Sequence, residues 1–239
     1  MVRRKKLGLL FSYEESWIGG TYYILNIVHA LNTLDETKKP EITILSSKEE
    51  DFDYVQSETG YPFLNFLKIK RKRRIDSLAK IYKKIKYVYK AQVIDPDLDM
   101  IFPNPEEHYI IENDEAKCYW IPDFQEENLP ELFPIRDIVN RKQDQIKVAL
   151  TAKKLILSSY DALNTYQSLY PFAKNTPLVL QFAVSNKVFS PLDYSFLQKK
   201  YELKKGFFFC ANQFWIHKNH MLLLEAVKKL KGDGLDVPV

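Results

Sequence analysis

Cysteine is scarce in this sequence. Cys118 and Cys210 are the only two cysteines among 239 residues, and each lies in an apolar run that predicts a buried strand. Disulfide frameworks and structural zinc sites need several cysteines at short spacings. The sequence therefore predicts neither kind of site, and it favours the reducing cytoplasm.

Long apolar runs are missing as well. The first apolar run, Leu7 to Phe11, follows basic residues, is too short for a signal-peptide core and leads directly into Glu14 and Glu15. No later stretch is long enough to cross a membrane. We expect neither a leader peptide nor a membrane anchor.

Charge of one sign is not in large excess. The formal net charge is +4 with 28% charged residues, a balance that selects no partner and does not indicate a surface built for nucleic acid. Hydrophobic residues make up 46% of the chain and aromatic residues 14%, enough for a sizeable core. A disordered or fibrous protein is excluded, and the length fits one large domain or two small ones.

Short apolar runs alternate with segments of helical periodicity. The predicted strands are Leu7 to Phe11, Glu41 to Leu45, Phe63 to Ile69, Asp99 to Phe102, Lys117 to Ile121, Leu155 to Ser158 and Leu178 to Phe182. The predicted helices are Tyr22 to Leu31, Ile75 to Lys90, Ile135 to Ala152 and Tyr160 to Tyr170. This alternation predicts an α/β fold with a Rossmann-like, doubly wound parallel sheet, whose ligands bind beyond the carboxyl ends of the strands.

The pattern changes near residue 183. We predict a first domain over 1–182, a linker over 183–205 and the start of a second Rossmann-like domain over 206–239. The last part contains one apolar run, Phe207 to Cys210, and one helix, Asn219 to Leu230. One strand and one helix cannot bury an apolar strand on both faces. We therefore expect that most of the second domain is missing from this chain.

Four segments together resemble the retaining glycosyltransferases of family 4 (group 1), which have the GT-B fold. They are Trp17 to Tyr23, Trp120 to Phe133, Leu157 to Asp161 and Asn212 to His220, and their order and spacing match the family from the first predicted strand to the last helix. The segment around His217, Lys218 and Asn219 is the most specific.

The resemblance implies an enzyme that moves a hexose from a nucleotide-sugar donor to a carbohydrate or lipid-linked acceptor with retention of configuration. It implies a role in cell-envelope polysaccharide synthesis, an acceptor-side first domain and an active site between the two domains. It implies no metal and no cofactor, because positive groups and helix dipoles would stabilise the leaving diphosphate. His217 and His220 are three residues apart, but no carboxylate or cysteine accompanies them as a metal ligand.

Gly19 and Gly20 stand between a predicted strand and a predicted helix. Glycine lets the backbone approach a ligand closely, and the amides of a helix N-terminus attract an anion. The resemblance places donor phosphate near this loop. On its own, a glycine pair here is more often a plain turn and helix start.

Lys218 lies at the entrance to the last predicted helix. By resemblance its ammonium group neutralises the donor diphosphate as the glycosidic bond breaks, and it is the strongest site residue. Without the resemblance it would be read as a solvated surface charge. Asn212 and Gln213 are predicted to contact donor or phosphate, or else to cap the loop.

Asp123 follows a predicted strand, where a carboxylate can orient an acceptor hydroxyl or relay its proton. A capping role is an equally good interpretation. Many relatives have a histidine where this chain has Pro122, which puts the usual histidine contact with the donor sugar in doubt. Gln125 and Glu126 are predicted to bind the acceptor. Ser158 and Ser159 follow another strand without a nearby histidine, so capping of the next helix is expected of them.

A basic run from Lys68 to Arg74 leads into a lysine-rich helix that ends at Lys90. Apolar residues interleave with the lysines, which suits attachment to an anionic membrane surface at the inner face of the membrane. A solvated helix face is the commoner explanation of such a pattern. Nucleic-acid binding rests on the basic run alone, and we expect none.

Two functions of different classes remain open at this stage. The first is the transferase itself. The second is an inactive remnant or binding module, because relatives hold the donor with two glutamates further along the second domain than this chain extends.

Overall fold

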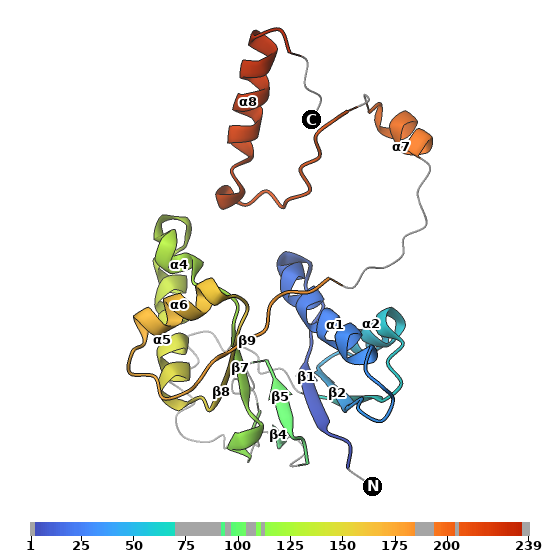
Figure 1. Cartoon of the computed structure of the whole chain (residues 1–239), viewed down its shortest axis with the longest axis vertical. Coiled ribbons are helices and arrows are strands. Elements are labelled where there is room, and N and C mark those ends of the chain that lie inside the picture. The colour runs from blue at the N-terminus through green and yellow to red at the C-terminus, as the bar shows by residue number, and fades with distance from the viewer. Residues whose placement is uncertain are drawn as a thin grey trace, which may run out of the picture. The chain divides into compact units, whose positions relative to one another are not determined.

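The computed structural model describes residues 3–69, 92–93, 97–103, 109–110, 113–184, 194–203 and 206–235. The predicted helix from Ile75 to Lys90 and nearly all of the basic run lie outside these residues. The chain divides into two compact units, each described here by itself (Figure 1). Unit 1 comprises Met1–Asn128 and Ile135–Ser185, and unit 2 comprises Leu129–Pro134 and Asn186–Val239.

Unit 1 is built on parallel strands. A four-stranded sheet has the order β3-β2-β1-β5, with β1 (Lys6–Leu10), β2 (Glu41–Ser46), β3 (Leu64–Lys68) and β5 (Met100–Phe102). A three-stranded sheet has the order β7-β8-β9, with β7 (Cys118–Ile121), β8 (Lys154–Leu157) and β9 (Leu178–Val179). A parallel bridge from Ile101 to Lys117 joins β5 to the start of β7. β4 (Gln92–Val93) and β6 (Tyr109–Ile110) form a separate parallel pair.

The strand order confirms the predicted α/β, Rossmann-like fold. The chain places β2 and β3 on one side of β1, then returns to place β5, β7, β8 and β9 on the other side. In doubly wound sheets the ligand site lies at the carboxyl ends of the strands, where the order reverses. Here that point lies between β1 and β5.

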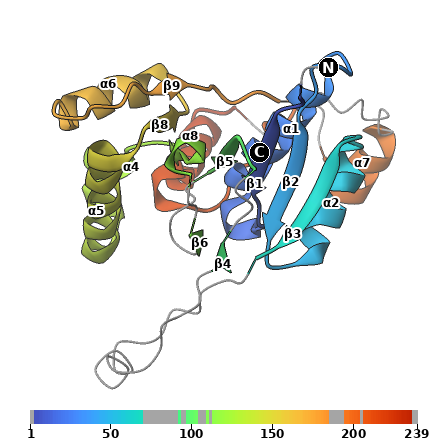
Figure 2. The ribbon, with the colours of Figure 1, turned by 90° about the horizontal axis from the view of Figure 1, so that it is seen from below.

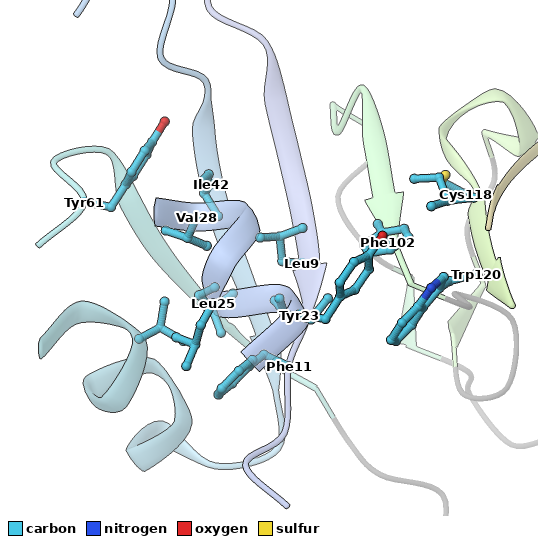
Figure 3. Close-up of a cluster of buried hydrophobic side chains, with 14 residues drawn as sticks. Leu9, Phe11, Tyr23, Leu25, Val28, Ile42, Tyr61, Phe102, Cys118 and Trp120 are labelled. Atoms are coloured by element: carbon cyan, nitrogen blue, oxygen red, sulfur yellow. The ribbon is translucent and has the colours of Figure 1, made fainter. Parts of the chain in front are cut away.

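Helices cover both faces of the sheet. The four neighbours of the strands are α1 (Ile18–Asn32), α2 (Glu49–Thr59), α5 (Ile135–Thr151) and α6 (Tyr160–Leu169). Figure 3 shows Leu25 and Val28 of α1 packed with Leu9 and Ile42 of the strands.

Successive residues of β7 serve opposite faces. Cys118 and Trp120 join the core under α1 and α2, whereas Tyr119 and Ile121 join a second core with α5 and α6. This alternation is the period of two expected of a strand.

Unit 2 contains helices but no strand among its described residues. These helices are η3 (Pro130–Leu132), α7 (Tyr194–Tyr201), η4 (Ile216–Lys218) and α8 (His220–Gly232). The predicted strand from Phe207 to Cys210 is wrong, because these residues pair with no strand in the part described, and Cys210 is exposed rather than buried. An apolar run becomes a strand only where a neighbour accepts its backbone hydrogen bonds.

Cys118 is buried as predicted, and neither cysteine forms a disulfide. Among the described residues, sequence analysis did not predict the helices α2, α4 (Gln125–Asn128) and α7. Among the residues that the structure describes, no helix is both long and apolar enough to cross a membrane.

Candidate functional site

The loop between β1 and α1 lies at the carboxyl edge of the sheet, and two buried side chains hold it. The Thr21 hydroxyl accepts a hydrogen bond from the Glu14 amide (3.2 Å) and donates one to the Ser12 carbonyl (3.4 Å). The Asp51 carboxylate accepts from the Tyr13 amide (3.1 Å) and from the Ser46 hydroxyl. The loop is thus fixed from α1 and from the start of α2.

The two glycines of this loop have different surroundings. A methyl group built on Gly20 would meet the indole of Trp17 at 2.5 Å, so glycine is required there to seat that ring. A methyl group on Gly19 would meet nothing within 4 Å. Gly19 is therefore the glycine that leaves open space beside the first turn of α1.

The first turn of α1 has amides that no side chain caps, because Trp17 occupies the N-cap position. Such amides attract an anion. Glu14 and Glu15 lie just before the helix, and their charges oppose an anion at the same place. A phosphate here would therefore need positive charge from another group.

An aromatic column backs the loop. The Trp120 indole stacks on Tyr23 at 4.4 Å between ring centroids and on Trp17 at 5.5 Å (Figure 3 shows Tyr23 and Trp120). Trp120 and Tyr23 are buried, while Trp17 is 53% exposed. The Trp17 indole is therefore exposed to solvent on one side and packed against the buried rings of the column on the other.

Hydrogen bonds fix the column at both sides. The Trp120 indole N–H donates to the Ser158 hydroxyl (2.8 Å), which ties β7 to the end of β8. The Tyr23 hydroxyl donates to the Leu180 carbonyl (2.9 Å), and burial raises the pKa of Tyr23 to about 12. Tyr23 therefore keeps its proton at neutral pH and does not act as an acid or a base there.

Asp123 follows β7, also at the carboxyl edge. Its side chain is 43% exposed, its Oδ1 accepts from the Gln125 amide at 3.4 Å, and the Arg141 guanidinium lies 3.8 Å away. The amide contact is the local bond expected of a carboxylate just before a helix, here α4 (Gln125–Asn128). The remaining exposed surface of the carboxylate can meet a ligand.

Glu126 is placed differently from Asp123. Its side chain is fully buried, and its carboxylate accepts from Arg141 (3.1 Å) and from the Gln145 amide group (2.5 Å). Gln145 in turn accepts from the Tyr170 hydroxyl (2.7 Å). In this conformation Glu126 faces protein groups, whereas Gln125 is half-buried at the start of α4.

The predicted site residues of unit 2 lie on an exposed loop before α8. The Gln213 side chain accepts from the Trp215 indole N–H (2.8 Å), and the Asn212 amide group contacts the Cys210 sulfur at 3.7 Å. Lys218 is exposed at the end of η4. Asn219 then adopts a left-handed conformation (φ 49°), and its side chain caps α8 by accepting from the Leu222 amide (3.3 Å).

Two serines and two histidines complete the predicted set. Ser159 caps α6 by accepting from the Ala162 amide (3.0 Å), as predicted, while Ser158 bonds to Trp120 instead. His217 lies in η4, and His220 begins α8 with its ring against Phe214 at 4.7 Å. Within the described part of the chain, no three His, Cys, Asp or Glu side chains gather as metal ligands would.

The structure thus brings Gly19, Gly20, Asp123 and Gln125 to one edge of unit 1 and leaves Asn212, Gln213 and Lys218 in unit 2. Sequence analysis missed three residues that shape this edge: Thr21, Asp51 and Arg141. Thr21 directly follows the glycine pair, and that position in the first helical turn was the one signal available. No family model, no curated protein and no solved structure matches this chain.

Proposed function

We propose that this chain takes part in the transfer of a hexose from a nucleotide sugar to a carbohydrate or lipid-linked acceptor, with retention of configuration. One observation supports this most. The doubly wound sheet sets the open Gly19 turn and the half-exposed Asp123 at the carboxyl ends of β1 and β7, the two strands on either side of β5. This is the edge where such sheets bind nucleotides and their reaction partners.

Within unit 1, the first turn of α1 is the proposed contact for donor phosphate. The uncapped amides supply oriented dipoles, and Gly19 leaves room for an approach to the backbone. Within unit 2, the exposed ammonium group of Lys218 is a further proposed contact to donor phosphate. Asn212 and Gln213 are the proposed neutral contacts to donor or phosphate.

The acceptor is assigned to Asp123 and Gln125. A carboxylate at this position can orient a hydroxyl group and take up its proton as the new bond forms. The Arg141 guanidinium, 3.8 Å from Asp123, places a positive charge beside this carboxylate. Glu126 would join only if it broke its bonds to Arg141 and Gln145.

The proposed setting is the cytoplasm, at the inner face of the membrane, in cell-envelope polysaccharide synthesis. The anionic membrane contact through Lys68 to Lys90 belongs to this proposal, although almost all of it lies outside the described residues. The reaction would use no metal and no cofactor.

Calorimetric titration of the chain with nucleotide sugars tests donor binding. We expect saturable binding of one nucleotide sugar, weakened about tenfold or more by Lys218→Ala because a charge-assisted contact is lost. Lys228→Ala, which removes another exposed lysine, this one from α8, is the matched control and should bind like the wild type. Equal affinity in both variants would remove Lys218 from the site.

Product analysis tests the chemistry. With a donor and an acceptor that react, NMR of the first-formed product should show the anomeric configuration of the donor sugar. Inversion at that carbon would contradict the proposal. Asp123→Asn should lower kcat with little change in donor affinity, because the carboxylate is assigned to the acceptor.

A non-catalytic binding module is the second candidate. It is favoured by the helices of unit 2, since α7, η4 and α8 contain no buried residue. These described helices therefore offer no buried side chains against which a donor could pack. Binding of a nucleotide sugar or glycan without any turnover would support this candidate over the transferase.

A further inference from the structure

Helix α5 has four exposed aliphatic side chains that contribute to neither core of unit 1. Their exposed fractions are 81% for Ile135, 46% for Val139, 43% for Ile146 and 63% for Leu150. Single exposed aliphatic residues are common on protein surfaces and need no explanation. Four exposed aliphatic side chains on one helix are less common, and their arrangement around the helix indicates whether they form one surface.

These four residues lie on one face of the helix. At 3.6 residues per turn, the positions 135, 139, 146 and 150 fall within about 60° of one another around the axis. We call this set the α5 stripe. The buried residues of α5 are Gln145, Val148 and Ala149, and they lie on the adjoining face, against the core shared with α6. Figure 2 shows α5 at the outer edge of unit 1.

Basic residues border the stripe. Arg136 and Lys147 lie along one side of it, and Lys142 lies about 20° beyond its other edge. Lys142 also meets a carboxylate of a neighbouring segment, at Glu127 (3.0 Å).

The acidic residues of α5 lie elsewhere. Asp137 and Asp144 fall roughly 150° to 170° from the middle of the stripe, on the opposite side of the helix. The stripe thus combines apolar side chains with positive charge and excludes the negative charge of its own helix. A surface that matches both properties is apolar beneath an anionic layer.

We propose that the α5 stripe is the contact surface of this protein with a lipid bilayer that contains anionic lipid. The aliphatic side chains would enter the boundary between head groups and acyl chains, with the helix parallel to the membrane plane. Arg136, Lys142 and Lys147 would meet the lipid phosphates. This surface is separate from the Lys68 to Lys90 segment, and it does not depend on sugar transfer.

A second copy of the chain fits the stripe less well. In an antiparallel pair about a two-fold axis, Ile135 would meet Leu150 of the other copy, and Val139 would meet Ile146. The same pairing would bring Arg136 near Lys147 of the other copy, and Lys142 near its own equivalent. Like charges at such an interface are repulsive, whereas an anionic membrane attracts all three.

Vesicle flotation with the complete chain tests the proposal. We expect the wild type to float with vesicles of phosphatidylcholine and phosphatidylglycerol at 7:3. Its affinity for pure phosphatidylcholine vesicles should be lower by about tenfold or more. The double variant Ile135→Ser, Leu150→Ser should lose about tenfold or more of its binding to the anionic vesicles, because two aliphatic side chains no longer enter the interface. Both residues are largely exposed, so the variant should keep the wild-type circular dichroism spectrum.

The matched control is the double variant Met221→Ser, Leu224→Ser on α8, where the exposed fractions are 63% and 57%. It should float like the wild type. Flotation of the stripe variant at the wild-type level would overturn the proposal, as would failure of the wild type to bind anionic vesicles. Light scattering completes the test, since a wild-type dimer that becomes monomeric in the stripe variant would assign the stripe to self-association and overturn the proposal as well.

Discussion

The indole ring of Trp17 lies directly over Gly20, so closely that a methyl group on the glycine would come within 2.5 Å of ring carbon Cζ3. The other neighbour of this indole is Trp120, at 5.5 Å between ring centroids. Gly20 and Trp120 together determine where the exposed part of Trp17 stands. A glycine pair that suggests a phosphate loop in the sequence therefore has one member that serves packing and one, Gly19, that leaves space.

Gly20→Ala should destabilise unit 1 by about 1–3 kcal/mol, because the added methyl group must displace a ring that is already packed. The Trp17 indole should become more mobile and more exposed. Chemical unfolding followed by circular dichroism measures the first effect, and acrylamide quenching of tryptophan fluorescence measures the second.

Gly19→Ala is the control for this prediction. Its methyl group would enter open space in the first turn of α1, where alanine is the better helix former. We expect a change within about 1 kcal/mol and no change in quenching. Equal destabilisation by both substitutions would show that the Trp17 contact is not what constrains Gly20.

Asp51→Ala should destabilise the chain by about 2–4 kcal/mol, because it leaves the Tyr13 amide and the Ser46 hydroxyl without their buried partner. Asp51→Asn keeps one acceptor oxygen and should cost less. Asp53→Ala, an exposed neighbour on α2, should be nearly neutral. Urea unfolding of the three variants gives the order, and a neutral Asp51→Ala would contradict the role given to this carboxylate.

The sheet of unit 1 was predictable because its strands are short apolar runs set between helical segments. β1, β2 and β7 begin and end within one residue of their predicted limits. β9 was predicted to reach Phe182 but pairs only over Leu178–Val179, because pairing depends on the length of β8 and not on the run itself. Phe207 to Cys210 failed as a strand for a related reason, since no strand lies beside it in the part described.

Helix α2 was missed because its pattern is mostly polar. Two of its three buried residues, Asp51 and Thr59, are polar and break the apolar periodicity that marks a helix face. Part of the candidate site was missed because its contacts join residues that are far apart in the sequence. Asp51 acts on Tyr13 across 38 residues of sequence, and Arg141 acts on Glu126 across 15, so neither relation leaves a local signal.

Glu126→Gln should lower the free energy of unfolding by about 1–3 kcal/mol, because a neutral amide replaces a carboxylate that accepts from Arg141 inside the protein. Gln125→Ala should change it by less than about 1 kcal/mol, since Gln125 is half-buried and its backbone amide makes the contact with Asp123. Thermal unfolding of both variants makes the comparison. An unchanged Glu126→Gln protein with weaker glycan binding would restore Glu126 to the acceptor site.

Buried tyrosines predict how stability changes at alkaline pH. Burial raises the pKa values of Tyr23, Tyr61 and Tyr170 to about 12 each, from about 10 in an unfolded chain. Between pH 10 and pH 12 the folded state therefore holds more protons than the unfolded state, so the free energy of unfolding falls as the pH rises. The contribution is complete below pH 10 and is lost as the pH passes through 12.

Each of the three tyrosines should lower stability by up to about 1.4 kcal/mol per pH unit in this window. Urea unfolding at intervals from pH 8 to pH 11 measures the decline, and absorbance at 295 nm reports tyrosinate formation. Tyr23→Phe should flatten the decline by one tyrosine's share, while costing about 0.5–1.5 kcal/mol at pH 8 because the Leu180 carbonyl loses its donor. Tyr160→Phe removes an exposed hydroxyl and should leave both quantities unchanged. If the free energy of unfolding of Tyr23→Phe fell with pH as steeply as that of the wild type, the Tyr23 hydroxyl would have to titrate near pH 10. That result would contradict the burial of this hydroxyl against the Leu180 carbonyl.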